Sequence, residues 1–109
     1  DSSLVTYAPL LKKQSGHLDF NQSAQMLALK VRAYTPWPGT FTFWKGNRLI
    51  IHAAKAVAVT SPGPGVFTIY EGYPAIGTVE GILVLDLLQL AGKKKSSGKT
   101  FLNGTPDWE

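Results

Sequence analysis

"TFTFWKGNRLIIHAAKAVAV", residues 40–59, alternates in side-chain character on both sides of a Gly-Asn pair at 46–47. A period of two indicates a β-strand with one buried face, and Gly-Asn supplies a turn that tolerates positive φ. The stretch therefore predicts two strands joined by a tight turn. In the second strand the pattern assigns Leu49, Ile51 and Ala53 to one face and Ile50, His52 and Ala54 to the other.

Three more apolar runs follow this pair, at residues 66–70, 75–78 and 81–90, separated by turns that contain glycine. We interpret all three as strands, because Gly81 and the β-branched start of the last run favour a strand over a helix. Upstream, residues 17–20 alternate as a further, short strand would.

One helix is expected before the strands. Ser23 is a candidate N-cap, and an apolar stripe at three-and-four spacing follows it: Ala24, Leu27, Ala28, Val31 and Tyr34. Pro36 should end the helix, because proline lacks an amide donor and restricts the residue before it.

The element order predicts a mainly β domain, a small closed β-barrel with one amphipathic helix near the N-terminus. Several short strands in about eighty residues favour closure, since a closed sheet leaves no exposed edge. Residues 1–15 are assigned to an irregular lead-in, 16–104 to the barrel and 105–109 to a tail. We expect a monomer.

Composition excludes several function classes. The 109 residues contain no cysteine, so neither a disulfide framework nor a thiol nucleophile is available. No apolar run is long enough to predict a membrane span. The start, Asp1-Ser2-Ser3-Leu4, resembles a cut within a linker, so we expect a fragment of a longer protein. The net charge is +4 and the cations are clustered, which indicates a polyanionic partner; a solvated surface loop is the alternative.

The densest cluster of cations lies in "LQLAGKKKSSGKTFL", residues 88–102, which contains Gly98-Lys99-Thr100. A nucleotide-phosphate loop needs four residues between its first glycine and the Gly-Lys-Thr, but five separate Gly92 from Gly98. Such a loop also needs a following helix, and only nine residues remain after Thr100. The nucleotide interpretation therefore fails.

No catalytic or metal site emerges. His17 and Asp19 share a strand face but fall two ligands short of a metal site, and His52 lies among apolar residues. In the corner Pro36-Trp37-Pro38-Gly39, a tryptophan held between prolines is interpreted as a core plug, with an exposed base-stacking residue as the alternative.

Together these segments resemble the C-terminal domain of the methionyl-tRNA formyltransferase family. The matching stretches are "YAPLL" at 7–11, "GHLDF" at 16–20, "RAYTPWPGTF" at 32–41, "GNRLIIHAA" at 46–54 and "GILVLDLLQLAGKKKSSGKTFLNG" at 81–104. Relatives often carry a helix after the Gly-Lys-Lys loop; here Gly98 falls in its first turn, which should weaken that helix by about 1 kcal/mol relative to alanine.

The resemblance implies an OB-type barrel tethered to an N-terminal formyltransferase domain in the same chain. That domain would bind 10-formyltetrahydrofolate and hold the catalytic residues, so no cofactor is expected here. The barrel would hold initiator tRNA in the cytoplasm through phosphate contacts from Lys93, Lys94, Lys95, Lys45, Arg48, Lys12 and Lys13. Two alternatives remain: the structural domain of a related 10-formyltetrahydrofolate-dependent enzyme acting on a small molecule, or a free-standing oligonucleotide-binding module.

Overall fold

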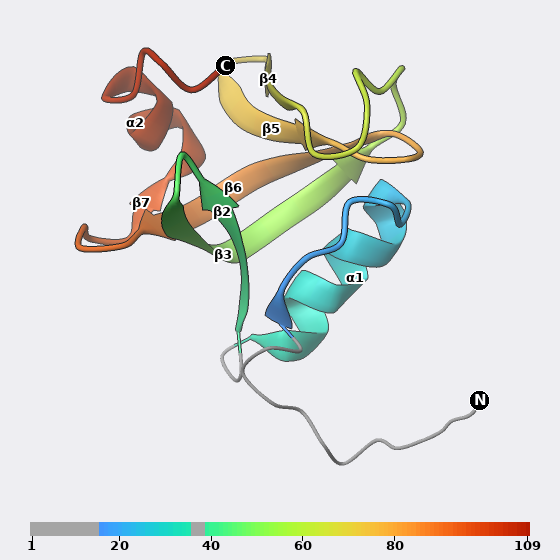
Figure 1. Cartoon of the computed structure of the whole chain (residues 1–109), viewed down its shortest axis with the longest axis horizontal. Helices are drawn as coiled ribbons and strands as arrows, with labels where there is room; N and C mark the ends of the chain where they lie inside the picture. Colours follow the sequence, from blue (N-terminus) through green and yellow to red (C-terminus); the bar gives the residue numbers. More distant parts are fainter. Residues whose placement is uncertain (1–15, 36–38) are drawn as a thin grey trace.

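The computed structural model describes residues 16–35 and 39–109. The expected lead-in at 1–15 and three corner residues, Pro36, Trp37 and Pro38, lie outside this part. Figure 1 shows a strongly bent antiparallel sheet with one helix against each end. The elements are α1 (Ala24–Tyr34), β2 (Thr40–Trp44), β3 (Asn47–Val57), β4 (Phe67–Tyr70), β5 (Tyr73–Gly77), β6 (Ile82–Leu90), β7 (Ser96–Ser97) and α2 (Gly98–Asn103).

The sheet has the strand order β2-β3-β6-β5-β4, and the two-residue strand β7 adds to β6. Every strand pair is antiparallel. The predicted mainly β class with an N-terminal amphipathic helix is confirmed. The sheet is not closed by hydrogen bonds, however, because β2 and β4 at its two ends do not pair in the described part of the chain.

Trp108 fills the space between these two edges. Its indole N–H donates to the carbonyl oxygen of Thr68 on β4 at 2.7 Å, and its own carbonyl accepts from the indole of Trp44 on β2 at 3.2 Å. The Trp108 side chain is only 1% exposed and packs on the rings of Trp44 and Phe67. The segment expected as a tail at 105–109 therefore reaches into the core, since a large aromatic gains much by burial.

Helix α1 forms as its sequence predicts. The Ser23 hydroxyl accepts from the amide of Met26 at 3.2 Å, and Thr35 is extended with ψ 134°, as expected before proline. Leu27 and Val31 are buried in the main core with Leu49, Ile51, Leu83, Leu85 and Leu88. After the helix, Gly39 adopts φ 86° and donates its amide to the carbonyl of Tyr34, which explains the glycine of the corner.

Strand β3 differs from the predicted pattern at one place. Its pairing with β6 shifts register between Ile51 and Ala53 and again between Ala53 and Ala54. A bulge of this kind reverses which side chains face the core. Leu49 and Ile51 share one face as predicted, and that face is buried, but Ala54 rather than Ala53 then packs against the main core.

Two local predictions are corrected. Residues 17–20 form no strand; a single parallel bridge joins His17 to Phe41. The turn between β2 and β3 consists of Lys45 and Gly46, at φ 49° and 81°, rather than of Gly46 and Asn47, because Asn47 already pairs with Trp44. Neither α1 nor α2 has the length and apolar composition needed to cross a membrane.

Helix α2 forms despite Gly98 in its first turn. Ser97 caps it by accepting the amide of Thr100 at 3.2 Å. Gly98 is buried against β6, and a Cβ there would collide with the carbonyl oxygen of Leu85. Close packing therefore requires this glycine even though it weakens the helix.

We expect Gly98→Ala to lower the free energy of unfolding by about 1–3 kcal/mol, as overpacking does, although alanine favours helices. The control is Gly104→Ala, where the nearest atom to an added Cβ is 3.8 Å away and φ is −94°. Urea denaturation measures both variants. A Gly98→Ala protein as stable as the control contradicts the packing argument.

Candidate nucleic-acid interface

The lysine loop, defined as Gly92 to Lys95, joins β6 to β7. Its backbone is held in place: the amide of Ala91 donates to the carbonyl of Arg48 at 2.9 Å, and the Gln89 side chain donates to the carbonyl of Lys93 at 3.0 Å. Gly92 turns the chain with φ 81°. The side chains of Lys93, Lys94 and Lys95 are all exposed. A fixed backbone thus presents three cations to solvent.

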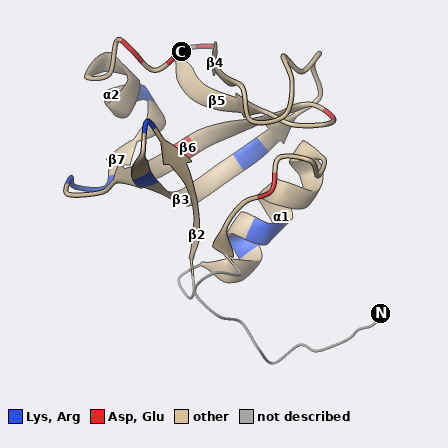
Figure 2. Cartoon of the chain, in the orientation of Figure 1, with Lys and Arg blue, Asp and Glu red and all other residues tan. Residues whose placement is uncertain are grey.

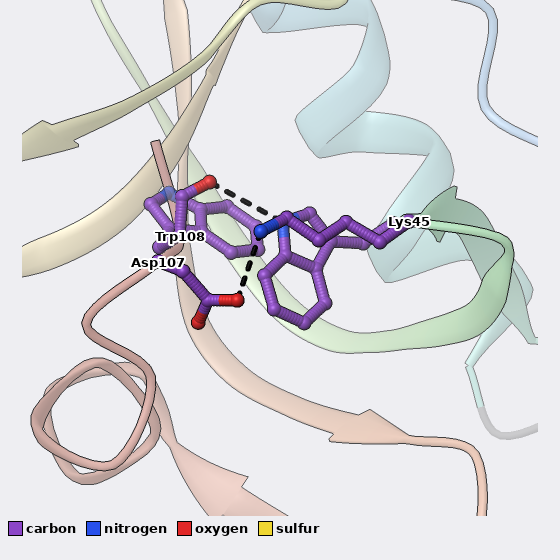
Figure 3. Close-up of polar contacts among 4 residues, drawn as sticks. Lys45, Asp107 and Trp108 are labelled. Atoms are coloured by element: carbon purple, nitrogen blue, oxygen red, sulfur yellow. Dashed lines mark hydrogen bonds and ion pairs between the residues drawn. The ribbon is translucent and has the colours of Figure 1, made fainter.

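Lys45 lies at the tip of the β2–β3 turn, near this loop. Trp44, the residue before the turn, lines one cavity of about 330 Å³ together with Lys93, Lys94 and Asp107. Lys45 is not a bare cation. Its Nζ lies 2.8 Å from Oδ2 of Asp107 and 5.2 Å from the centroid of the Trp44 ring (Figure 3). The bond from Lys45 lowers the pKa of the Asp107 carboxyl.

Arg48 completes the group at the start of β3. It is exposed, and its guanidinium carbon lies 4.2 Å from the centroid of the Phe41 ring. The loop, the turn and the start of β3 therefore form one end of the sheet, as Figure 2 shows by the blue segments there. We call this the basic end; its residues are Lys45, Arg48, Lys93, Lys94 and Lys95.

The structure thus brings together five of the predicted site residues, and the remaining two, Lys12 and Lys13, lie outside the described residues. Three other exposed cations belong to other segments: Arg32 to α1, Lys55 to the last part of β3 and Lys99 to α2, where its side chain lies beside Gly72 of the β4–β5 turn. Lys30 is half-buried on α1 and donates to the carbonyl of His17 at 3.4 Å. Burial lowers the pKa of Lys30, and the nearby carboxylate of Asp19 partly opposes that shift.

Two features of this end were missed by the sequence analysis. Asp107 places a carboxylate beside the turn, and Trp108 locks that carboxylate's segment onto the sheet. The sequence does hold a signal for Trp108: it is the only aromatic residue among the last eight, in "TPDWE". In residues 16–35 and 39–109, no three His, Asp or Glu side chains gather as metal ligands would.

The geometry defines a class: a small antiparallel β domain with one basic end. Within that class, the model of the "Formyl transferase, C-terminal domain" family matches residues 10–106. The methionyl-tRNA formyltransferase of Koribacter versatilis is 44% identical over 102 residues, which are 91% of this chain and 32% of that protein. The one of Geobacter metallireducens is 36% identical over 105 residues, which are 95% of this chain and 33% of that protein.

The chain therefore belongs to the formyl transferase C-terminal domain family, which confirms the resemblance, and it spans about a third of the length of these relatives. HypX from Aquifex aeolicus, in the crystal structure with tetrahydrofolic acid, shares the fold. The TM-score is 0.71 at 17% identity, covering 96% of this chain and 19% of that one.

Proposed function

We propose that this chain is the tRNA-holding domain of a cytoplasmic methionyl-tRNA formyltransferase. The observation that supports it is the basic end, where five cations from three separate segments lie together. Clustered cations neutralise successive phosphates and release condensed counterions, so this surface suits an RNA backbone. Relatives at 44% and 36% identity are named for an enzyme that acts on methionyl-tRNA.

In this proposal the catalytic work belongs to an N-terminal formyltransferase domain of the same protein, which takes the formyl group from 10-formyltetrahydrofolate. The exposed cations of the present chain can hold a phosphate backbone. A tethered second site raises the effective concentration of tRNA at the catalytic domain. Phosphate contacts do not read bases, so discrimination of the initiator lies elsewhere.

A second candidate is the structural domain of a related enzyme that acts on a small molecule. The ion pair between Lys45 and Asp107 favours this alternative, because it neutralises one cation of the basic end. Four other cations remain at that end, and neither the loop lysines nor Arg48 forms an ion pair within the described residues. The balance therefore favours RNA.

Filter binding with initiator tRNA separates these two candidates. The tRNA proposal predicts saturable binding by the monomeric 109-residue chain, with log K falling against log salt at a slope of about −4 if all five cations meet phosphates. An elongator tRNA should bind about equally well. If neither tRNA binds saturably, the structural alternative holds.

Changing Asp107 to Asn should strengthen tRNA binding about two- to threefold at low salt, because it removes a carboxylate that repels phosphate and frees Lys45. The free energy of unfolding should change little, since both partners are more than half exposed. Glu71→Gln, at the exposed β4–β5 turn, is the control with the same charge change. Equal gains in the two variants would show that only net charge matters.

A further inference from the structure

The outer face of β2 carries an aromatic cluster that the phosphate contacts do not use. Alternation along β2 directs Trp44 into the core, where it stacks on Trp108, and Phe41 and Phe43 to the opposite face. Phe43 is 46% exposed. Covering a phenylalanine this exposed with a binding partner lowers the free energy, because apolar surface is removed from water.

The rings of the cluster pack closely against one another. The His17 and Phe41 rings are stacked with centroids 5.2 Å apart and planes at 7°, and Phe43 meets both edge-on at 5.5 and 5.7 Å. The backbone fixes this arrangement, because Leu18 donates its amide to the Phe41 carbonyl at 3.0 Å. Arg48 lies over the Phe41 ring. We call His17, Phe41, Phe43 and Arg48 the aromatic platform.

The platform adjoins the lysine loop. In the sheet Phe41 pairs with Ile50, and Ile50 with Gln89, so these three side chains share the outer face. Gln89 also holds the carbonyl of Lys93, and Arg48 belongs both to the platform and to the basic end. A nucleic-acid strand whose phosphates lie on the loop would thus place its next nucleotides over Phe43.

We propose that the platform stacks an unpaired base of the RNA strand that the basic end holds; this rests on the proposed function. Aromatic faces stack on any base, and an arginine beside them adds a cation–π contact. Charge complementarity favours RNA over an apolar protein surface, because a cation and the lysine loop border the aromatic rings. The platform would select single-stranded over paired segments, which the phosphate contacts alone do not do.

The test uses two RNA probes of one sequence, a single-stranded decamer with a central 2-aminopurine and its fully paired duplex. Phe43→Ala should weaken binding of the single strand about tenfold, remove the 2-aminopurine quenching, and leave both the duplex affinity and the salt slope unchanged. Phe43→Tyr should retain binding and quenching. Phe43→Leu, which keeps an apolar side chain without a ring, should lose both.

The control is Ile69→Ala, a similarly exposed apolar residue on β4 (44% exposed). Three outcomes overturn the platform: Phe43→Ala binding the single strand as the control does, equal losses for single strand and duplex, or full binding by Phe43→Leu, which indicates an apolar contact that needs no aromatic ring. If the unmodified chain binds neither RNA, the proposed function fails as well. If it binds both equally in a salt-dependent way, only the platform fails.

Discussion

Trp108→Ala is expected to lower the free energy of unfolding by about 3–5 kcal/mol, the usual loss for a buried tryptophan. The change opens a cavity between Trp44, Phe67 and Phe101, whose rings lie 4.8–5.7 Å from that of Trp108. It also leaves the Thr68 carbonyl without its indole donor. Domains of this size are stable by about 5–15 kcal/mol, so this loss is a large fraction of the total free energy of unfolding.

Urea denaturation followed by far-UV circular dichroism measures the loss. Trp108→Phe keeps a ring but removes the indole N–H, so it should fall between alanine and the unmodified chain. The exposed Val79 (58% exposed) provides the control, Val79→Ala, which should change stability by less than about 0.5 kcal/mol. If Trp108→Ala unfolds like this control, Trp108 does not join the two sheet edges.

Converting Lys93, Lys94 and Lys95 together to glutamate should weaken tRNA binding by about a hundredfold or more near 50 mM salt, and by less than about threefold near 500 mM. Three phosphate contacts are lost and three repulsions are added, and both effects are screened as salt rises. Filter binding across a salt series measures the change. The free energy of unfolding should be unaffected, because the three side chains are exposed.

The matched control converts Arg32, Lys55 and Lys99 to glutamate. These residues are also exposed and the change in net charge is the same, but none of them belongs to the lysine loop: Arg32 lies on α1, Lys55 near the end of β3, and the Lys99 side chain lies beside Gly72 in the β4–β5 turn. Its loss of affinity should be at most about fivefold, the effect of net charge alone. Equal losses in the two triple variants would mean that the position of the charges is irrelevant, and the basic end would lose its role.

Much of the fold could be predicted because its signals are local. The cap at Ser23, the stripe through Leu27 and Val31, and the strands at β2 and β6 were predicted from neighbours in sequence, and all appear in the structure. Local signals also located the lysine loop. The β3 bulge was not predictable, because it results from pairing with β6, which lies some thirty residues away.

The other features depend on packing between residues far apart in sequence, so they could not be predicted. From sequence alone Trp108 belongs to a polar tail, yet its hydrogen-bond partners Trp44 and Thr68 lie 64 and 40 residues away in the chain. From sequence alone Gly98 only weakens a helix; the structure shows that the Leu85 carbonyl beside it leaves no room for a side chain. For the site, the sequence predicted the cations but neither the Asp107 partner of Lys45 nor the stack of His17 on Phe41.

The most direct test of the basic end is an amide chemical-shift titration of the 109-residue chain with initiator tRNA. The proposal predicts the largest changes at Lys45, Arg48 and Lys93 to Lys95. Amides at the far end of β3 and β6, beside the cavity lined by Ser23, Val59 and Glu80, should stay unchanged. Changes concentrated at that far end, with the basic end unmoved, would contradict the account.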